Sequence, residues 1–180
     1  MAGREARRPR RSWRKLHLAL DADTGEIAAS ILTGIDADHA GRVPNLLDQI
    51  EGETASVTAD SAYDGEPVYQ AVASRQPGQP PTVVIPSRSS AVPSTTCNAP
   101  PSQRDQHIQL IRSKGRMAWQ QATGCGRCSW VDTVIGRYKT AIGSKRRART
   151  FHNQQGEAAI AAEILNRMIQ TAQPISVRVA

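Results

Sequence analysis

Residues 15–32, KLHLALDADTGEIAASIL, have the sequence pattern of a β-hairpin. Leucines occupy every second position from 16 to 20, as in a strand that buries one face. The turn residues Asp23, Thr24 and Gly25 follow, and a second apolar segment runs from position 27 to position 32. The hairpin is therefore the element around which we expect the fold to be built.

Strand and helix patterns alternate downstream of this hairpin. The helix expected after Asp36 or Asp38, either of which can cap it, places apolar side chains at positions 43, 46, 47 and 50 and covers the hairpin. Short strands are expected at 56–59 and 82–85, and helices at 66–74, 105–121, 131–142 and 157–171. Strands with interleaved helices, followed by helices, predict an α/β domain.

The composition favours a polyanionic partner inside the cell. Lys and Arg outnumber Asp and Glu by 23 to 16, which gives a net charge of +7. Many basic proteins bind no nucleic acid, so the position of the charges matters more than their sum. The three cysteines do not form a secreted disulfide framework, and no apolar run is long enough to cross a bilayer. These features predict a cytoplasmic protein with no membrane insertion.

Asp60 is the first candidate for chemistry, because it stands where the strand at 56–59 ends. Enzymes that transfer phosphoryl groups gather such carboxylates around two Mg²⁺ ions, which activate the attacking oxygen and stabilise the leaving one. The alternative is that Asp60 caps the turn into the next helix, a role that Asp64 could also play.

Asp132 is the second candidate acid. It lies seven residues before Lys139 in WVDTVIGRYKTAIGSKRRAR, residues 130–149, so a helix would place both side chains on one face. A carboxylate and a cation can then point into one groove. The alternative is a solvated helix face with an ordinary charge pattern.

Several segments, in this order, resemble the DDE domain of insertion-sequence transposases. They are RRSWRKLHLALDADTGEI, ADSAYDGEPVY, RDQHIQLI, WVDTVIGRYKTAIGSKRRAR and NQQGEAAIAAEILNRM. The resemblance covers nearly all of the chain after the first dozen residues. It implies a ribonuclease H-like mixed sheet with flanking helices, and three acids that bind Mg²⁺ or Mn²⁺ for strand cleavage and strand transfer. It also implies DNA partners, namely transposon ends and target.

By this resemblance Asp60 corresponds to the second acid. The third acid lies in a signature of Tyr, two residues, Arg, three residues, Glu, six residues and Lys, which falls on Cys125, Cys128, Asp132 and Lys139. Only the Lys is unchanged. Aspartate is one methylene shorter than glutamate, and Mg²⁺ requires near-ideal octahedral ligands. These substitutions predict reduced activity.

The first acid of the family lies on a strand upstream of the segment resembling RRSWRKLHLAL. We therefore expect the sheet to be incomplete at its N-terminal strand and the chain to have little or no activity alone. Asp21 and Asp23 are expected to form the hairpin turn instead. The alternative to an enzyme is a non-catalytic basic remnant that binds DNA or a full-length transposase. The protein partner expected for the chain is a second copy, in a homo-oligomer, or a full-length transposase.

Cys125 and Cys128 have the spacing of a zinc or redox pair, but a structural zinc needs four ligands. We therefore favour chance substitution at these two positions.

The basic residues next to the second motif are better placed for a function than the acids. We expect the following to contact DNA phosphates: Arg137, Lys139, Lys145, Arg146, Arg147 and Arg149. The alternative is a solvated helix end, where cations also favour the helix dipole.

The predicted domain organisation has three parts. Residues 1–14 form a disordered basic arm, residues 15–172 the partial transposase domain, and residues 173–180 a tail. A Pro- and Ser-rich loop or insertion occupies residues 87–103.

Overall fold

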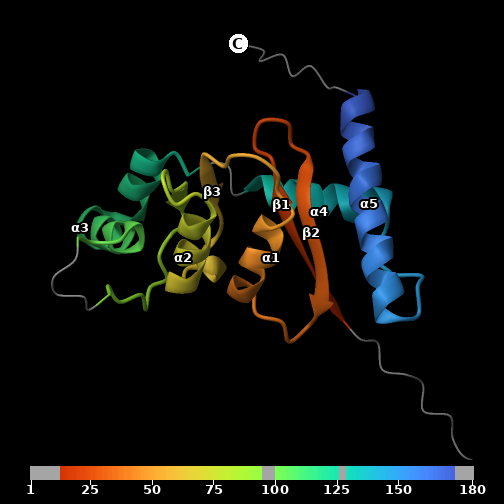
Figure 1. The fold of residues 1–180 in the computed structure, drawn as a ribbon, viewed down its shortest axis with the longest axis horizontal. Helices are drawn as coiled ribbons and strands as arrows, with labels where there is room; N and C mark the ends of the chain where they lie inside the picture. The colour runs from red at the N-terminus through yellow and green to blue at the C-terminus, as the bar shows by residue number, and fades with distance from the viewer. Residues whose placement is uncertain (1–12, 95–99, 126–128, 173–180) are drawn as a thin grey trace, which may run out of the picture.

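The computed structural model describes residues 13–94, 100–125 and 129–172 of the chain. The predicted α/β class is confirmed, since short strands precede and alternate with helices in the first half and long helices follow (Figure 1). The elements are β1 (Arg14–Leu20), β2 (Ile27–Gly34), η1 (Ala40–Arg42), α1 (Val43–Leu47), β3 (Ser56–Thr58), η2 (Ser61–Tyr63), α2 (Glu66–Arg75), β4 (Thr82–Val84), α3 (Gln103–Thr123), α4 (Ser129–Ala141) and α5 (Phe151–Ala172). The basic arm predicted for residues 1–14 lies outside the described residues except for Trp13 and Arg14, and the tail at 173–180 lies wholly outside them.

The predicted hairpin is β1 paired antiparallel with β2, with Leu18 opposite Ser30. Its turn is held by Asp21, whose Oδ1 accepts hydrogen bonds from the backbone N–H groups of Asp23 at 2.7 Å and Thr24 at 3.2 Å. The sequence pattern assigned Asp21 and Asp23 to this turn, and the geometry of Asp21 confirms that role for it.

Helices cover both faces of the hairpin. On one face its leucines pack against α4 and α5, in a core that includes Val134, Tyr138 and Leu165. On the other face His17 is buried, and its Nε2 lies 3.0 Å from the Thr33 hydroxyl. Burial, followed by the charges of His39, Lys15 and Arg42, lowers the pKa of His17. Neither face of the hairpin is therefore broadly exposed to solvent.

The other two strands, β3 and β4, form a separate parallel pair in which Val57 lies opposite Val83. The sequence led us to expect one mixed sheet, whereas the strands of the described residues form two sheets of two strands. The parallel pair packs with α1 and α2 in a second core that includes Val68, Val72 and Ile85. The two cores lie side by side along the long axis of the molecule (Figure 1).

Helix α3 begins with a capping box, in which the Ser102 hydroxyl accepts from Asp105 N and the Asp105 carboxylate accepts from Ser102 N. The helix is broken at Gly115, where φ is 82° and ψ is 166°. The break lets Trp119 Nε1 donate to His107 Nδ1 at 2.7 Å, although twelve residues of straight helix span about 18 Å. His107 Nε2 in turn donates to the Val83 carbonyl at 2.8 Å. The fold-back buries Trp119 completely.

Candidate DNA-binding surface and acidic residues

Asp60 lies two residues after the end of β3, with Ala59 between them. Its backbone is extended, and its Oδ1 accepts a hydrogen bond from Ala62 N at 2.8 Å, which caps η2. The side chain is exposed to solvent. Asp60 thus plays the capping role that was the alternative to metal binding, and a catalytic role for it stays a prediction.

Asp64 has a different role from the capping that the sequence allowed. Its carboxylate is buried, with Oδ1 accepting from Arg104 Nε at 2.8 Å and Oδ2 accepting from Arg88 N at 2.8 Å. Arg88 Nε and Nη2 donate to the carbonyls of Ser61 and Ala62 at 2.9 and 2.6 Å. This network fixes the turn that carries Asp60 against the segment after β4 and the start of α3. Sequence patterns contain no signal for it, because its members are far apart in the chain.

Asp132 and Lys139 lie on α4, and both side chains are exposed. The prediction that they share a face follows from the regular helix between them, since seven residues make nearly two full turns. The opposite side of α4 carries Val134 and Tyr138 into the core with the hairpin and α5. Both charged side chains are therefore available to solvent and to a ligand.

The predicted basic run forms the connection between α4 and α5, which we call the basic loop (residues 143–150). It begins at Gly143, whose φ of 101° suits glycine and whose N–H donates to the Tyr138 carbonyl at 3.2 Å. Lys145, Arg147 and Arg149 project from it as exposed side chains. Three cations thus meet solvent within five residues of chain.

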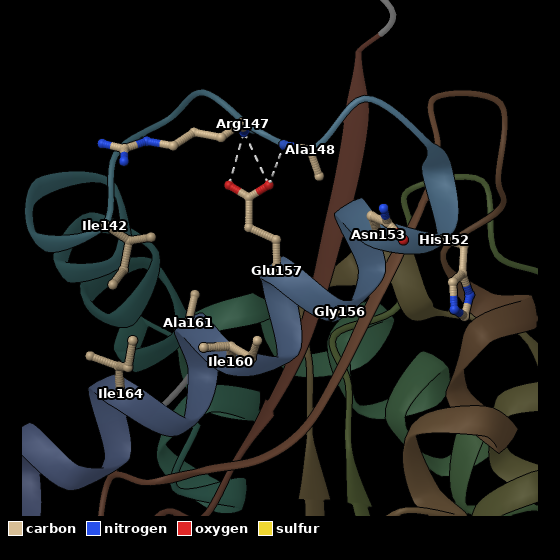
Figure 2. A pocket seen from close by; sticks show the side chains of 10 residues that line it. All are labelled: Ile142, Arg147, Ala148, His152, Asn153, Gly156, Glu157, Ile160, Ala161 and Ile164. Atoms are coloured by element: carbon tan, nitrogen blue, oxygen red, sulfur yellow. Dashed lines mark hydrogen bonds between the residues drawn. The ribbon is translucent and has the colours of Figure 1, made fainter.

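Glu157 of α5 holds the backbone of the basic loop in place (Figure 2). Its two carboxylate oxygens each lie 3.0 Å from Arg147 N, and one of them also lies 3.0 Å from Ala148 N. These backbone N–H groups, that of Ala148 first, lower the pKa of Glu157. Its carboxylate therefore bonds to the backbone and leaves the exposed basic side chains of the loop without an ion pair to it.

Arg146 differs from its neighbours in the basic loop. Its guanidinium lies over the Tyr138 ring, 4.8 Å from the centroid, and donates to the Tyr138 hydroxyl. Burial raises the pKa of Tyr138, although Arg146 opposes the shift. Arg146 therefore attaches the loop to α4 through its side chain, while Lys145, Arg147 and Arg149 extend outward.

Arg14 adds a cation that was not among the predicted DNA contacts. Its Nε donates to Gln154 Oε1 at 3.0 Å, and its guanidinium lies 4.8 Å from the centroid of the Phe151 ring. These contacts place the start of β1 beside the start of α5, next to the basic loop. The arginine-rich residues before Trp13 join the described chain at this point.

Comparison with known protein families gives a match over nearly the whole chain: residues 2–166 match the family model described as transposase DDE domain. The chain belongs to the DDE transposase family. No solved structure matches the chain. The DDE transposase assignment agrees with the resemblance of the ordered sequence segments, and it supports a role in DNA transposition.

The DDE transposase family uses divalent metal ions, which require several acidic ligands close together. Among residues 13–94, 100–125 and 129–172, no group of three His, Cys, Asp or Glu side chains lies close enough to hold a metal ion. Asp60 has one oxygen engaged by Ala62 N, and Asp21 has one engaged in the hairpin turn. The described residues therefore do not fit a complete three-acid metal site.

The cysteine motif can be followed only in part. Cys125 is partly buried after α3, whereas Cys97 and Cys128 lie outside the described residues.

None of the helices in the part of the chain that the structure describes is long and apolar enough to cross a membrane.

Proposed function

We propose that this DDE transposase chain binds the DNA backbone through the basic loop and the adjacent face of α4, and that it cuts DNA little or not at all on its own. The observation that carries the proposal is the basic loop, with Lys145, Arg147 and Arg149 exposed and its backbone held by Glu157. Arg137 and Lys139 are two further exposed cations on α4, the helix that leads into the basic loop.

The fixed conformation of the basic loop favours phosphate binding over the alternative, in which its cations only contact solvent at a helix end. A loop that is already held in one conformation loses less conformational entropy when it binds. Phosphate contacts made by Lys and Arg position a protein on DNA without reading its sequence. The proposed contact is therefore with the backbone of transposon-end or target DNA, and its affinity falls steeply as salt rises.

The second half of the proposal concerns the acids. Asp60 and Asp132 are exposed carboxylates. By the resemblance of their motifs they correspond to two metal ligands of the family, for which Mg²⁺ or Mn²⁺ would be the ion. No three acidic side chains are gathered into a metal site in the described part of the chain. Asp132 also reaches less far than the glutamate of the family signature. We therefore expect binding without efficient strand cleavage.

Fluorescence anisotropy with a labelled DNA duplex tests the binding half. We expect the double variant Lys145→Gln/Arg147→Gln to bind on the order of tenfold or more weakly at about 0.1 M salt, since two phosphate contacts are lost. The matched control is Lys114→Gln/Arg116→Gln, which removes two exposed cations from α3 at the far end of the molecule (Figure 1). Equal losses in both variants would reject the basic loop as the binding surface.

Nicking of a supercoiled plasmid, with Mg²⁺ or Mn²⁺ added, tests the catalytic half. We expect the native chain to nick no faster than Asp60→Ala, and Asp60→Ala to bind DNA as tightly as the native chain. Rapid metal-dependent nicking that disappears in Asp60→Ala and Asp132→Ala would contradict the proposal and would favour an active strand transferase.

A further inference from the structure

Amide side chains close the outer edge of β2, the strand edge that faces away from β1. The backbone N–H and C=O of Ile27 pair with the side-chain Oδ1 and Nδ2 of Asn166 at 2.7 and 3.0 Å. Further along the strand, Ser30 N donates to Gln49 Oε1 at 3.2 Å. A free strand edge is a template for pairing with another strand, and these contacts block it on β2.

The outer edge of β1 is open by comparison. Directly opposite residues of an antiparallel pair alternate between hydrogen-bonded and non-hydrogen-bonded pairs. Because Ser30 N is bonded to Gln49, Ser30 and its partner Leu18 form a non-hydrogen-bonded pair. The backbone N–H and C=O groups of Leu18, and by the alternation those of Leu16, therefore point away from β2. None of the described residues forms a hydrogen bond with these outward groups.

This open edge has the properties of a site for strand addition. A backbone N–H or C=O without a partner is unfavourable where it is buried, and Leu18 is only 8% exposed. Leu16 and Leu20, on either side of it, are partly buried and pack at the border of the core with α4 and α5. An extended segment with apolar residues at every second position would satisfy the backbone groups and extend this core.

The tail of this chain (residues 173–180) has such a sequence. Its apolar residues Ile175, Val177 and Val179 alternate with Ser176 and Arg178. Valine and isoleucine are also among the residues most enriched in strands. The alternation gives the tail one apolar face, as the leucines give β1.

Helix α5 ends beside the turn of the hairpin, where a returning strand would begin (Figure 1). Near this end, Gln170 Nε2 donates to Glu26 Oε1 at 2.9 Å. Pro174 follows shortly after and has no N–H with which to continue the helix. An extended chain from Ala172 to Val177 spans up to about 17 Å, whereas neighbouring strands lie about 4.8 Å apart. The tail is therefore long enough to cross the turn and run back along β1.

From the open edge, the alternating tail and the position of the helix end, we propose that the tail adds to β1 as a third, antiparallel strand. Val177 and Val179 lie opposite Leu20 and Leu18, so their side chains share the leucine face. The outward N–H and C=O groups of Leu18 then bond to Val179. The added strand closes the edge against strands of other polypeptides. It uses none of the residues proposed to contact DNA.

Amide hydrogen exchange followed by NMR tests the added strand in the full chain. We expect the Leu18 N–H to exchange at least about tenfold more slowly in the native chain than in Val177→Pro, because proline removes a donor and is excluded from strand interiors. The matched control Val177→Ile keeps the strand pattern and leaves the exchange rate unchanged. The N–H of His17, which pairs with Ile31 inside the hairpin, stays equally protected in all three chains and shows that each is folded.

Nuclear Overhauser contacts between backbone protons of Val179 and Leu18 are expected in the native chain and are lost in Val177→Pro. Equal exchange of the Leu18 N–H in the native chain and Val177→Pro would overturn the proposal, since the tail would then not cover this edge. Protection that rises with protein concentration would overturn it as well, because the strand would then come from a second copy.

Discussion

Replacing Asp64 by asparagine tests the network that fixes the turn carrying Asp60. The Asp64 side chain is 1% exposed and that of Arg104 is 14% exposed, and their closest atoms, Asp64 Oδ1 and Arg104 Nε, are 2.8 Å apart. The amide keeps the shape of the carboxylate but removes its charge. Arg104 is then left as a mostly buried cation without its counter-ion.

The expected cost follows from this burial. Removing one partner of a buried ion pair typically costs about 3–5 kcal/mol. Arg104 keeps a second acceptor, the Val92 carbonyl at 3.1 Å, and the introduced amide keeps one acceptor oxygen, so we place the loss in unfolding free energy near the lower end, at about 3 kcal/mol. For a chain of this length that corresponds to a fall in Tm of about 6–12 °C.

Urea denaturation followed by circular dichroism measures the change, and the exposed Glu163–Arg167 pair provides the control. Their side chains are 60% and 75% exposed, so Glu163→Gln should cost no more than about 0.5 kcal/mol. A loss below about 1 kcal/mol for Asp64→Asn, or a loss equal to that of Glu163→Gln, would refute the inference that this buried pair holds the turn.

Two other predictions concern backbone and pH. Gly115→Ala should lower the unfolding free energy by about 1–3 kcal/mol, because φ of 82° with ψ of 166° is a glycine conformation, and a red shift of tryptophan fluorescence would report the loosening of Trp119. Unchanged stability and fluorescence would contradict the role given to the break. Glu157→Gln should be less stable than the native chain at about pH 7, because the lowered pKa of Glu157 in the fold stabilises the ionised form. The difference should shrink as pH falls below the ordinary value of 4.5 and vanish once pH has passed through the lowered pKa. A difference that persists undiminished at about pH 2 would show that the carboxylate charge is not responsible.

The sequence predicted the elements that have local signatures. Leucines at every second position predicted β1, and the spacing of apolar residues predicted α4 and α5. The start of α5 was expected at residue 157, whereas the helix begins at Phe151. The break in α3 was not predicted, because a lone glycine in a helical pattern is usually tolerated. The contact that the break allows, between Trp119 and His107, joins residues twelve positions apart and has no local sequence signature. The division into two sheets was missed as well, since strand periodicity carries no information on which strands pair.

The candidate site shows the same division between local and distant signals. Asp60 could be placed at the end of a strand from sequence, but the same position also suits a cap of the next turn, which is the contact that it makes with Ala62 N. The contacts of Glu157 with the basic loop and of Arg146 with Tyr138 join residues eight or more positions apart, which periodicity does not reveal. These contacts divide the cations of the basic loop into two kinds. Arg146 attaches the loop to α4, whereas Lys145, Arg147 and Arg149 are exposed.

The salt dependence of DNA affinity tests the central claim most directly. Each phosphate contact contributes a slope of about −0.9 to the logarithm of affinity against the logarithm of salt concentration. We predict that Lys145→Gln/Arg147→Gln makes this slope shallower by about 2, while Lys114→Gln/Arg116→Gln leaves it unchanged. An identical slope in the native chain and the loop variant would contradict the claim that the basic loop follows the DNA backbone.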